Sequence, residues 1–222
     1  KKNINLIIQK ITGLSKEQLF LNPKIEKKYK EEIKKQTKKL QNWKPIEYII
    51  NNAEFYSLNF YVDNRVLIPR NDTEIMVKEA LKEIEKNNID LIDIWTGTSC
   101  IPISILKNTT NVNNCYVVDI SDKALEISKI NIKKYNLENK IKQICWDLLN
   151  IFLEKNNKNS FSEYKLHQNI VITANLPYIK NLDFENMDNE TIKYEPNLAL
   201  YWWKKTWFEL YEKLIKQSIK LK

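Results

Sequence analysis

The chain has 222 residues, of which 43% are hydrophobic, enough for one medium-sized domain and a small appendage. It shows no signal-peptide pattern and no run of about eighteen apolar residues, so we expect a cytoplasmic protein that does not cross a membrane. The 3 cysteines form no C-x-x-C pair and His167 is the only histidine, which disfavours a disulfide framework, a metal site and histidine-dependent catalysis.

The net charge of +8 raises the question of a nucleic-acid partner. Arg65 and Arg70 are the only arginines, so the side chain that binds phosphate and guanine through two parallel hydrogen bonds is nearly missing. Lysine, asparagine and isoleucine are abundant along the whole chain, as AT-rich coding would produce. We therefore interpret the charge mainly as solvated lysine faces, and we do not expect direct nucleic-acid binding.

Residues 1–50 are predicted to form a small helical domain. Ser15-Lys-Glu-Gln18 is typical of a helix start, and residues 25–40 form a long charged stretch with sparse apolar positions. The alternating run over residues 54–62 predicts a β-hairpin, which we place in a linker spanning residues 51–74. Asp72 is expected to cap the helix that follows, through Ile84.

Residues 75–222 are predicted to form an α/β domain. Strands are expected at residues 89–94, 114–119, 141–145 and 170–173, and helices at residues 101–107, 121–135 and 207–221. This alternation predicts a mostly parallel sheet with helices on both faces, whose ligands bind beyond the carboxyl ends of the strands, at the switch point. Because the chain stops after one further helix, we expect a fragment that lacks its closing strands.

Polar residues follow the first three predicted strands and are suited to binding a nucleoside. The first strand leads into Asp93-Ile-Trp-Thr-Gly-Thr-Ser99, a carboxylate followed by a glycine-containing turn. Asp119 ends the second strand, where a carboxylate can accept both ribose hydroxyls, and Asp147 follows the third, within reach of an adenine amino group. Each is also typical of a helix cap or a turn, but their joint occurrence favours a nucleoside site. The absence of a phosphate-binding lysine loop and of a complete G-x-G-x-x-G favours S-adenosylmethionine over nucleoside triphosphates and NAD.

The fourth predicted strand leads to the tetrapeptide Asn175-Leu176-Pro177-Tyr178. An amide side chain and a backbone carbonyl at a strand end can hold a planar –NH2 group, with an aromatic ring against its face. When acceptors fix its hydrogens, the nitrogen must point its lone pair at an incoming methyl group. The same residues are compatible with a simple turn after a core strand, so the tetrapeptide alone decides nothing.

Longer segments carry a resemblance to a known family. They are Lys44-Pro-Ile-Glu-Tyr-Ile49, Glu54-Phe-Tyr-Ser-Leu58, Val66-Leu-Ile-Pro-Arg-Asn-Asp-Thr-Glu74, Asp93 to Ser99, Val118-Asp119, Asn175 to Tyr178 and Tyr194-Glu-Pro-Asn-Leu-Ala-Leu200. On these segments the chain resembles the HemK/PrmC family of protein-(glutamine-N5) methyltransferases, which modify the glutamine of the Gly-Gly-Gln loop in peptide chain release factors. Val-Leu-Ile-Pro-Arg and Glu-Pro-x-x-Ala-Leu distinguish this family from ribosomal RNA adenine dimethyltransferases, in which Asn-Leu-Pro-Tyr also occurs.

The resemblance implies a Rossmann-like class I S-adenosylmethionine-dependent methyltransferase domain, a hairpin linker and an N-terminal helical domain that contacts the release factor. The implied cofactor-binding residues are Asp93, Trp95, Thr96, Gly97, Thr98, Ser99, Asp119, Asp147, Leu148 and Asn175. Asn175, Leu176, Pro177 and Tyr178 would bind the glutamine side chain, and Asn175, Pro177 and Tyr178 are the implied catalytic residues. Leu176 replaces the family's usual proline but keeps the backbone carbonyl. No metal is implied, because the sulfonium charge already activates the methyl group.

Two other functions remain open at this point. An adenine-N6 methyltransferase acting on RNA or DNA would use the same tetrapeptide on a flipped base, although two arginines make a poor nucleic-acid surface. A non-catalytic binding module derived from this fold becomes relevant if the tryptophans of the chain disable it.

The tryptophans depart from the family pattern systematically, with 2 glycines but 6 tryptophans in the chain. Trp43, Trp95, Trp146, Trp202, Trp203 and Trp207 all fall where the pattern carries glycine. If the tryptophans were ordinary core or surface residues, their six matches to glycine positions would all be coincidences. If the chain were a decayed, inactive paralogue, its substitutions would be scattered over many residue types. Our hypothesis is that the codon UGA means glycine in the source organism and is read here as tryptophan. A chain made with Trp95 is expected to bind S-adenosylmethionine weakly, because the indole would project toward its site.

Overall fold

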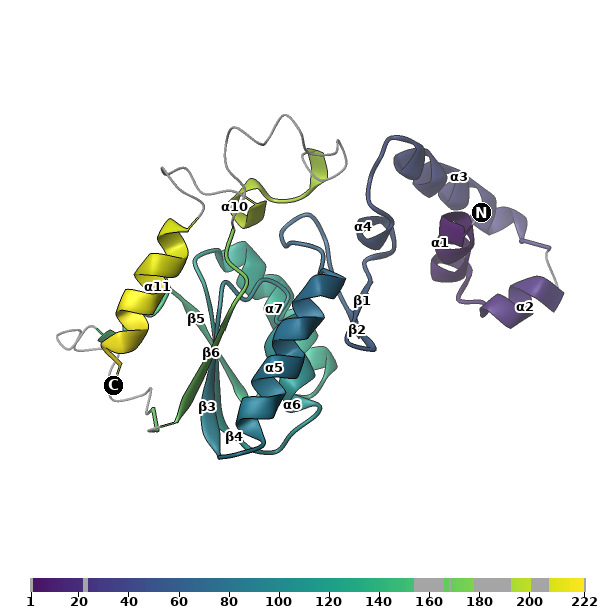
Figure 1. Cartoon of the computed structure of the whole chain (residues 1–222). Helices are drawn as coiled ribbons and strands as arrows, with labels where there is room; N and C mark the ends of the chain where they lie inside the picture. Colours follow the sequence, from purple (N-terminus) through teal and green to yellow (C-terminus); the bar gives the residue numbers. More distant parts are fainter. Residues whose placement is uncertain are drawn as a thin grey trace.

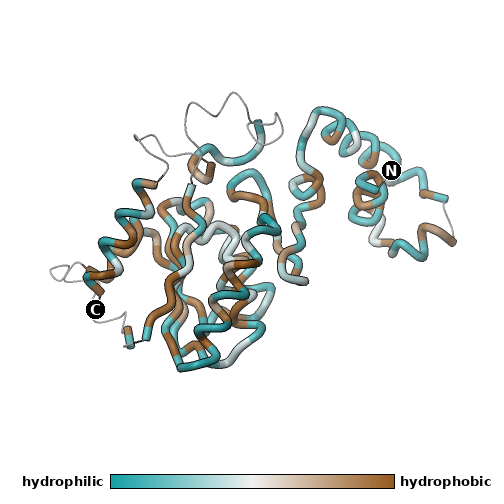
Figure 2. The backbone as a smooth tube through the Cα atoms, in the orientation of Figure 1, coloured by the Kyte–Doolittle hydropathy of each residue, from teal (hydrophilic) through white to brown (hydrophobic). Residues whose placement is uncertain are grey.

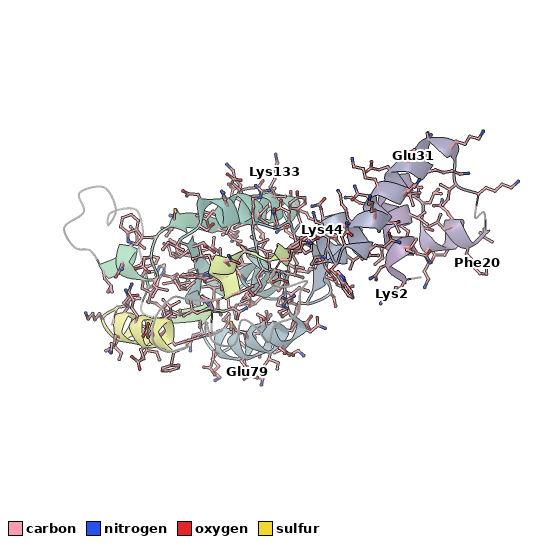
Figure 3. The ribbon with its side chains drawn as sticks, turned by 90° about the horizontal axis from the view of Figure 1, so that it is seen from above. Lys2, Phe20, Glu31, Lys44, Glu79 and Lys133 are labelled. Carbon is pink, nitrogen blue, oxygen red and sulfur yellow. The ribbon has the colours of Figure 1, made fainter. Side chains whose placement is uncertain are left out.

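The computed structural model describes residues 2–21, 24–153, 166–167, 169–177, 193–200 and 208–221. The N-terminal part consists of helices α1 (Lys2–Thr12), α2 (Lys16–Leu21), α3 (Lys27–Gln41) and α4 (Ile46–Ile50). The expected helix start at Ser15 is confirmed: the Ser15 Oγ accepts from the Gln18 N–H at 3.2 Å, and the Gln18 Oε1 accepts from the Ser15 N–H at 2.8 Å. Helices α1 and α3 pack together, apart from the sheet (Figure 1). Phe20 lies at their far end, and Lys44 lies where they join the rest of the chain (Figure 3).

The carboxyl end of α3 has the geometry that usually selects glycine. The Lys44 N–H donates to the Lys39 carbonyl and the Trp43 N–H to the Leu40 carbonyl, both at 3.1 Å, which is the Schellman motif. In this motif one residue adopts the left-handed conformation, and here it is Trp43, with φ of 65°. Gly13, Asn51 and Asn136, which tolerate this conformation better, follow α1, α4 and α7.

The linker contains strands β1 (Ala53–Phe55) and β2 (Leu58–Phe60), paired antiparallel as the alternating pattern predicts. A short 3-10 helix η1 (Asn71–Thr73) leads into α5 (Glu74–Ile84). The expectation that Asp72 caps α5 is wrong, because η1 places Thr73 at the N-cap position and no side chain accepts a hydrogen bond there.

The α/β part is built on strands β3 (Ile89–Ile94), β4 (Val112–Asp119), β5 (Ile141–Cys145) and β6 (Ile170–Ala174). All pairings are parallel, in the order β5-β4-β3-β6, so the predicted parallel sheet is confirmed. The chain moves outward from β3 through β4 to β5 and then returns to the other side of β3. The switch point therefore lies between the carboxyl ends of β3 and β6.

Helices cover both faces of this sheet, because successive residues of a buried strand point to opposite sides. Leu91 of β3 belongs to the core under α5, α6 (Cys100–Leu106) and α7 (Asp122–Lys134). Ile92 belongs to the core under α8 (Asn150–Leu153) and α11 (Glu209–Ile219). The strands appear as the apolar centre of the fold in Figure 2. Ser121 caps α7 as expected, its Oγ accepting from the Ala124 N–H.

The remaining described helix, α10 (Asn197–Leu200), lies above the carboxyl edge of the sheet (Figure 1). Helix α11 begins two residues later than expected, and Trp202, Trp203 and Trp207 lie outside the described residues. Within the described ranges, no helix combines the length and apolar character that a membrane span requires.

Candidate active site

A pocket of about 670 Å³, counted out to its open mouth, lies at the switch point. Five parts of the chain line it: linker residues Arg65 to Leu67, Pro69, Arg70 and Thr73; Trp95 to Thr98 with Cys100 and Ile101; Asp119, Ser121 and Ala124; Asn175; and Pro196, Leu198 and Ala199. The pocket therefore gathers three of the four predicted parts of the nucleoside and amide sites; the exception is the end of β5.

The turn after β3, residues 95–99, is called the β3 turn below. Its backbone is held against β4, since the N–H groups of Trp95 and Thr96 donate to the Val118 carbonyl at 2.8 and 3.1 Å. Trp95, Gly97 and Ser99 have φ of 62°, 52° and 59°. Tryptophan at such a φ carries a strain that glycine would avoid. The Trp95 side chain packs on the core under α11 and also lines the pocket, so it takes up space at the switch point.

Asp119 lies buried in the pocket at the end of β4. Its Oδ2 accepts from the Gly97 N–H at 2.9 Å and its Oδ1 from the Ser121 N–H at 3.0 Å. Burial raises the pKa of Asp119 to about 6. The carboxylate thus locks the β3 turn to the end of β4 and is 3% exposed. It is placed where a carboxylate can accept from the hydroxyls of a sugar.

Asp93 is buried beneath the pocket and does not line it. The hydroxyls of Thr173 and Thr96 donate to its Oδ1 and Oδ2, both at 2.6 Å. Burial raises the pKa of Asp93 to about 7, against the effect of the two hydrogen bonds. Asp93 thus contacts the β3 turn through Thr96 and strand β6 through Thr173.

The two raised pKa values predict that stability falls as pH rises. The pKa values of Asp93 and Asp119 in the folded chain lie above the ordinary value of 3.8. The folded chain therefore binds these two protons more tightly than the unfolded chain does, and protonation favours folding. We expect the melting temperature to fall between about pH 5 and pH 7.5, as circular dichroism can measure. Asp93→Asn should flatten this slope, whereas Asp72→Asn, at an exposed position, should leave it unchanged. A melting temperature that rises over this range would contradict the prediction.

The tetrapeptide after β6 begins at the pocket. Asn175 lines the wall, while Leu176 and Pro177 are buried behind it. Tyr178 lies outside the described residues. Asn175 and the β3 turn thus face the same cavity from adjacent strands, because β3 and β6 pair side by side.

Asp147 and Leu148 are not brought to the pocket wall. Asp147 forms an ion pair with Lys213 of α11 and accepts from the Asn150 amide at 3.3 Å. Leu148 is buried in the core under α11, with φ of 52°. Trp146 does not share the left-handed backbone of Trp43 and Trp95, so its backbone provides no argument for glycine.

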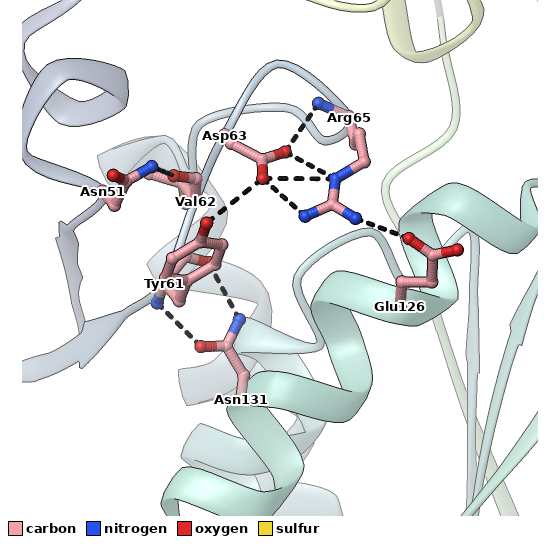
Figure 4. A network of polar contacts seen from close by, with 7 residues as sticks. All are labelled: Asn51, Tyr61, Val62, Asp63, Arg65, Glu126 and Asn131. Carbon is pink, nitrogen blue, oxygen red and sulfur yellow. Dashed lines mark hydrogen bonds and ion pairs between the residues drawn. The ribbon is translucent and has the colours of Figure 1, made fainter.

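The linker supplies pocket residues that the sequence reasoning did not assign. Arg70 donates to the buried Glu195 at 2.6 Å and so joins the linker to the segment that carries α10. Arg65 binds Asp63 and Glu126 of α7, and the Asn131 amide bonds the backbone of Tyr61 (Figure 4). Asn131 also donates to the Thr98 carbonyl at 3.1 Å. The sequence did contain a signal for these residues, since Arg70 and Glu195 lie in the two segments that distinguish this family from other methyltransferases.

Relatives of known sequence decide the family. The "Release factor glutamine methyltransferase" of Clostridium botulinum is 37% identical over 216 residues, covering 94% of this chain and 71% of the relative. The chain belongs to the release factor glutamine methyltransferase family. The Flavobacterium psychrophilum member is 35% identical over 167 residues, 73% of this chain and 53% of that protein. The chain therefore spans between about half and about 70% of these family members.

Structural comparison agrees on the fold. No protein-family profile matches the chain. The crystal structure of the hMettl16 catalytic domain in complex with MAT2A 3′UTR hairpin 6 has a TM-score of 0.55, covering 75% of this chain and 58% of that one. At 18% identity, this shows a shared fold. The expected Rossmann-like class I methyltransferase fold is confirmed, and with it the resemblance to the release factor glutamine methyltransferase family.

Proposed function

We propose that this protein transfers a methyl group from S-adenosylmethionine to the side-chain amide N5 of the glutamine in the Gly-Gly-Gln loop of peptide chain release factors. The observation that carries the proposal is Asn175 lining a pocket shared with the β3 turn, in a chain of this family. The relatives are named for this activity. We place the reaction in the cytoplasm, without a metal and without direct nucleic-acid binding.

The residues of the pocket fit S-adenosylmethionine except at one position. Asp119 offers a buried carboxylate to the ribose hydroxyls, and Gly97 leaves room because it has no side chain. The Trp95 indole stands in the pocket wall and reduces the available space. Thr96, Thr98 and Ser99 complete the turn, with Asp93 supporting it from below. We assign Asp147 the outer part of the adenine site, which requires Asp147 to leave Lys213. The cofactor, when bound, supplies a methyl group activated by the sulfonium charge.

The chain's own residues then act mainly by positioning. The Asn175 side chain and the Leu176 carbonyl would accept the two hydrogens of the glutamine amide, which points the nitrogen lone pair into the pocket. Pro177 stiffens this turn, and Tyr178 is assigned to pack on the amide plane. An amide nitrogen is a poor nucleophile, so fixed orientation and exclusion of water provide much of the rate.

We assign recognition of the release factor to the helical domain of residues 1–50. Residues 51–74 act as the linker and residues 75–222 as the methyltransferase domain. Support for this division comes from α1 to α3, which pack on one another away from the sheet. The linker is in turn bonded to α7, through Arg65 to Glu126 and through the Tyr61 carbonyl to Asn131.

A methylation assay that offers a release factor and total RNA side by side tests the proposal. With radiolabelled S-adenosylmethionine, we expect label on the release factor only, and mass spectrometry should place it on the glutamine of the Gly-Gly-Gln loop. A release factor in which this glutamine is replaced by alanine should remain unlabelled. Label on RNA alone would overturn the proposal in favour of an adenine-N6 methyltransferase.

A further inference from the structure

A buried chain of polar side chains runs across the carboxyl edge of the sheet, beneath the pocket. We call it the hydroxyl chain; its members in order are Thr173, Asp93, Thr96, Ser99, Ser128 and Gln143. It begins on β6, crosses β3 and the β3 turn, and ends on α7 and β5. The successive distances are 2.6, 2.6, 3.0, 2.5 and 2.9 Å.

When Asp93 is ionised, the direction of every hydrogen bond in this chain follows from its carboxylate. The Gln143 amide nitrogen also donates to the Leu125 carbonyl, at 2.8 Å, which fixes it as a donor toward Ser128. The ionised Asp93 carboxylate can only accept. Each hydroxyl has one proton, so Ser128 donates to Ser99, Ser99 to Thr96, and Thr96 to Asp93. When Asp93 becomes protonated this constraint is lost: Ser128 has two lone pairs and can accept from both Gln143 and Ser99, so the arm can reverse. A proton on Asp93 therefore displaces the hydrogen bond from Thr96 or the one from Thr173.

Thr173 is the contact through which the chain reaches β6. It pairs with Asp93 across the parallel register of β3 and β6, so the two side chains are neighbours on the same face. Thr173 stands two residues before Asn175 and is 3% exposed. Asp93 is followed by the β3 turn, which Thr96 also fixes to the carboxylate.

We propose that Thr173 is a positioning residue, which couples Asn175 to the β3 turn through Asp93. This inference rests on the proposed function, since it takes Asn175 and the β3 turn as the amide and cofactor sites. The coupling requires an ionised Asp93, because only the carboxylate accepts from both threonines at once. The other titratable groups that face Asp93 are the Asp119 carboxyl and the thiols of Cys100 and Cys115.

The first test is a pH titration of the full-length protein by nuclear magnetic resonance, which needs no methyl transfer. We expect the side-chain amide of Asn175 and the backbone amide of Thr96 to follow one common midpoint. Thr173→Val should reduce the pH-dependent change at Asn175 by about fivefold while Thr96 still titrates, and Thr173→Ser should restore it. Ser104→Ala is the matched control, because its buried hydroxyl has no hydrogen-bond partner among the described residues. An Asn175 signal that titrates equally in Thr173→Val, or that never shares the midpoint, would overturn the inference.

The second test separates positioning from a general loss of structure. In the methylation assay, Thr173→Val should lower kcat about tenfold, with the KM for S-adenosylmethionine changed less than about threefold, and Thr173→Ser should recover most of kcat. An equal loss in Thr173→Ser would contradict positioning by the hydroxyl. If methylation is seen without the shared titration, the proposed function stands and this inference fails. If the shared titration is seen without methylation, the coupling through Thr173 stands and the proposed function fails.

Discussion

Replacing Trp95 with glycine is expected to lower the Kd for S-adenosylmethionine at least about tenfold. Trp95 has φ of 62°, where a residue other than glycine is strained by about 1–2 kcal/mol. Its indole also lines the pocket, so its removal enlarges the space at the switch point. The lower Kd comes from the steric effect, because the cofactor no longer competes with the side chain, whereas relief of the backbone strain stabilises the free and the bound protein alike. Isothermal titration calorimetry of the two proteins measures the difference.

Trp43→Gly is the matched control for this experiment. Trp43 also has a left-handed backbone, with φ of 65°, but it is 64% exposed and does not line the pocket. The change should raise the free energy of unfolding by about 1 kcal/mol and leave the Kd unaltered. Micromolar affinity in the chain with Trp95 would show that the steric argument is wrong.

Trp43 and Trp95 also test the hypothesis that the codon UGA means glycine in the source organism. The structure supports it at Trp43 and Trp95 through their backbone angles and is neutral at Trp146. Mass spectrometry of the protein from its own organism should find glycine at residues 43 and 95. Tryptophan at these residues in the native protein would end the hypothesis, and a weak cofactor site would then be a property of the protein itself.

Replacing Asn175 with alanine is expected to lower kcat by about a hundredfold to a thousandfold, the cost of losing one oriented hydrogen-bonding group at a reacting centre. The KM for S-adenosylmethionine should change far less, because the β3 turn and Asp119 form the rest of the pocket. The methylation assay measures this in the parent chain and, if the parent is weakly active, in the Trp95→Gly protein.

Asn88→Ala removes the same amide at an exposed position before β3 and should leave kcat unchanged. An Asn175→Ala protein with more than about a tenth of the parent kcat would show that Asn175 does not orient the amide.

Local patterns in the sequence were sufficient to predict the strands of the sheet and many residues of the site. Strands β3, β5 and β6 begin and end within a residue of the predicted limits. Thr96, Gly97, Asp119 and Asn175 were candidates because they follow strand ends, and the parallel sheet brings these ends to one pocket.

Local pattern was insufficient where a contact joins distant parts of the chain. Asp93 was assigned to the cofactor, but its carboxylate bonds Thr173, 80 residues away, because β6 returns to the side of β3. Asp147 was assigned in the same way, and α11 instead supplies Lys213 to it. Neither neighbour is visible in the spacing of nearby residues.

The sequence by itself therefore determined the family, the parallel α/β architecture and the polar strand ends, since these depend on periodicity and on motifs that are contiguous in the chain. Only the tertiary structure decided that the linker and the segment around α10 close the pocket, and that Thr173 meets Asp93 beneath it. The physical reason is that strand order and loop packing are set by burial of the whole core. They bring together side chains that no local pattern relates.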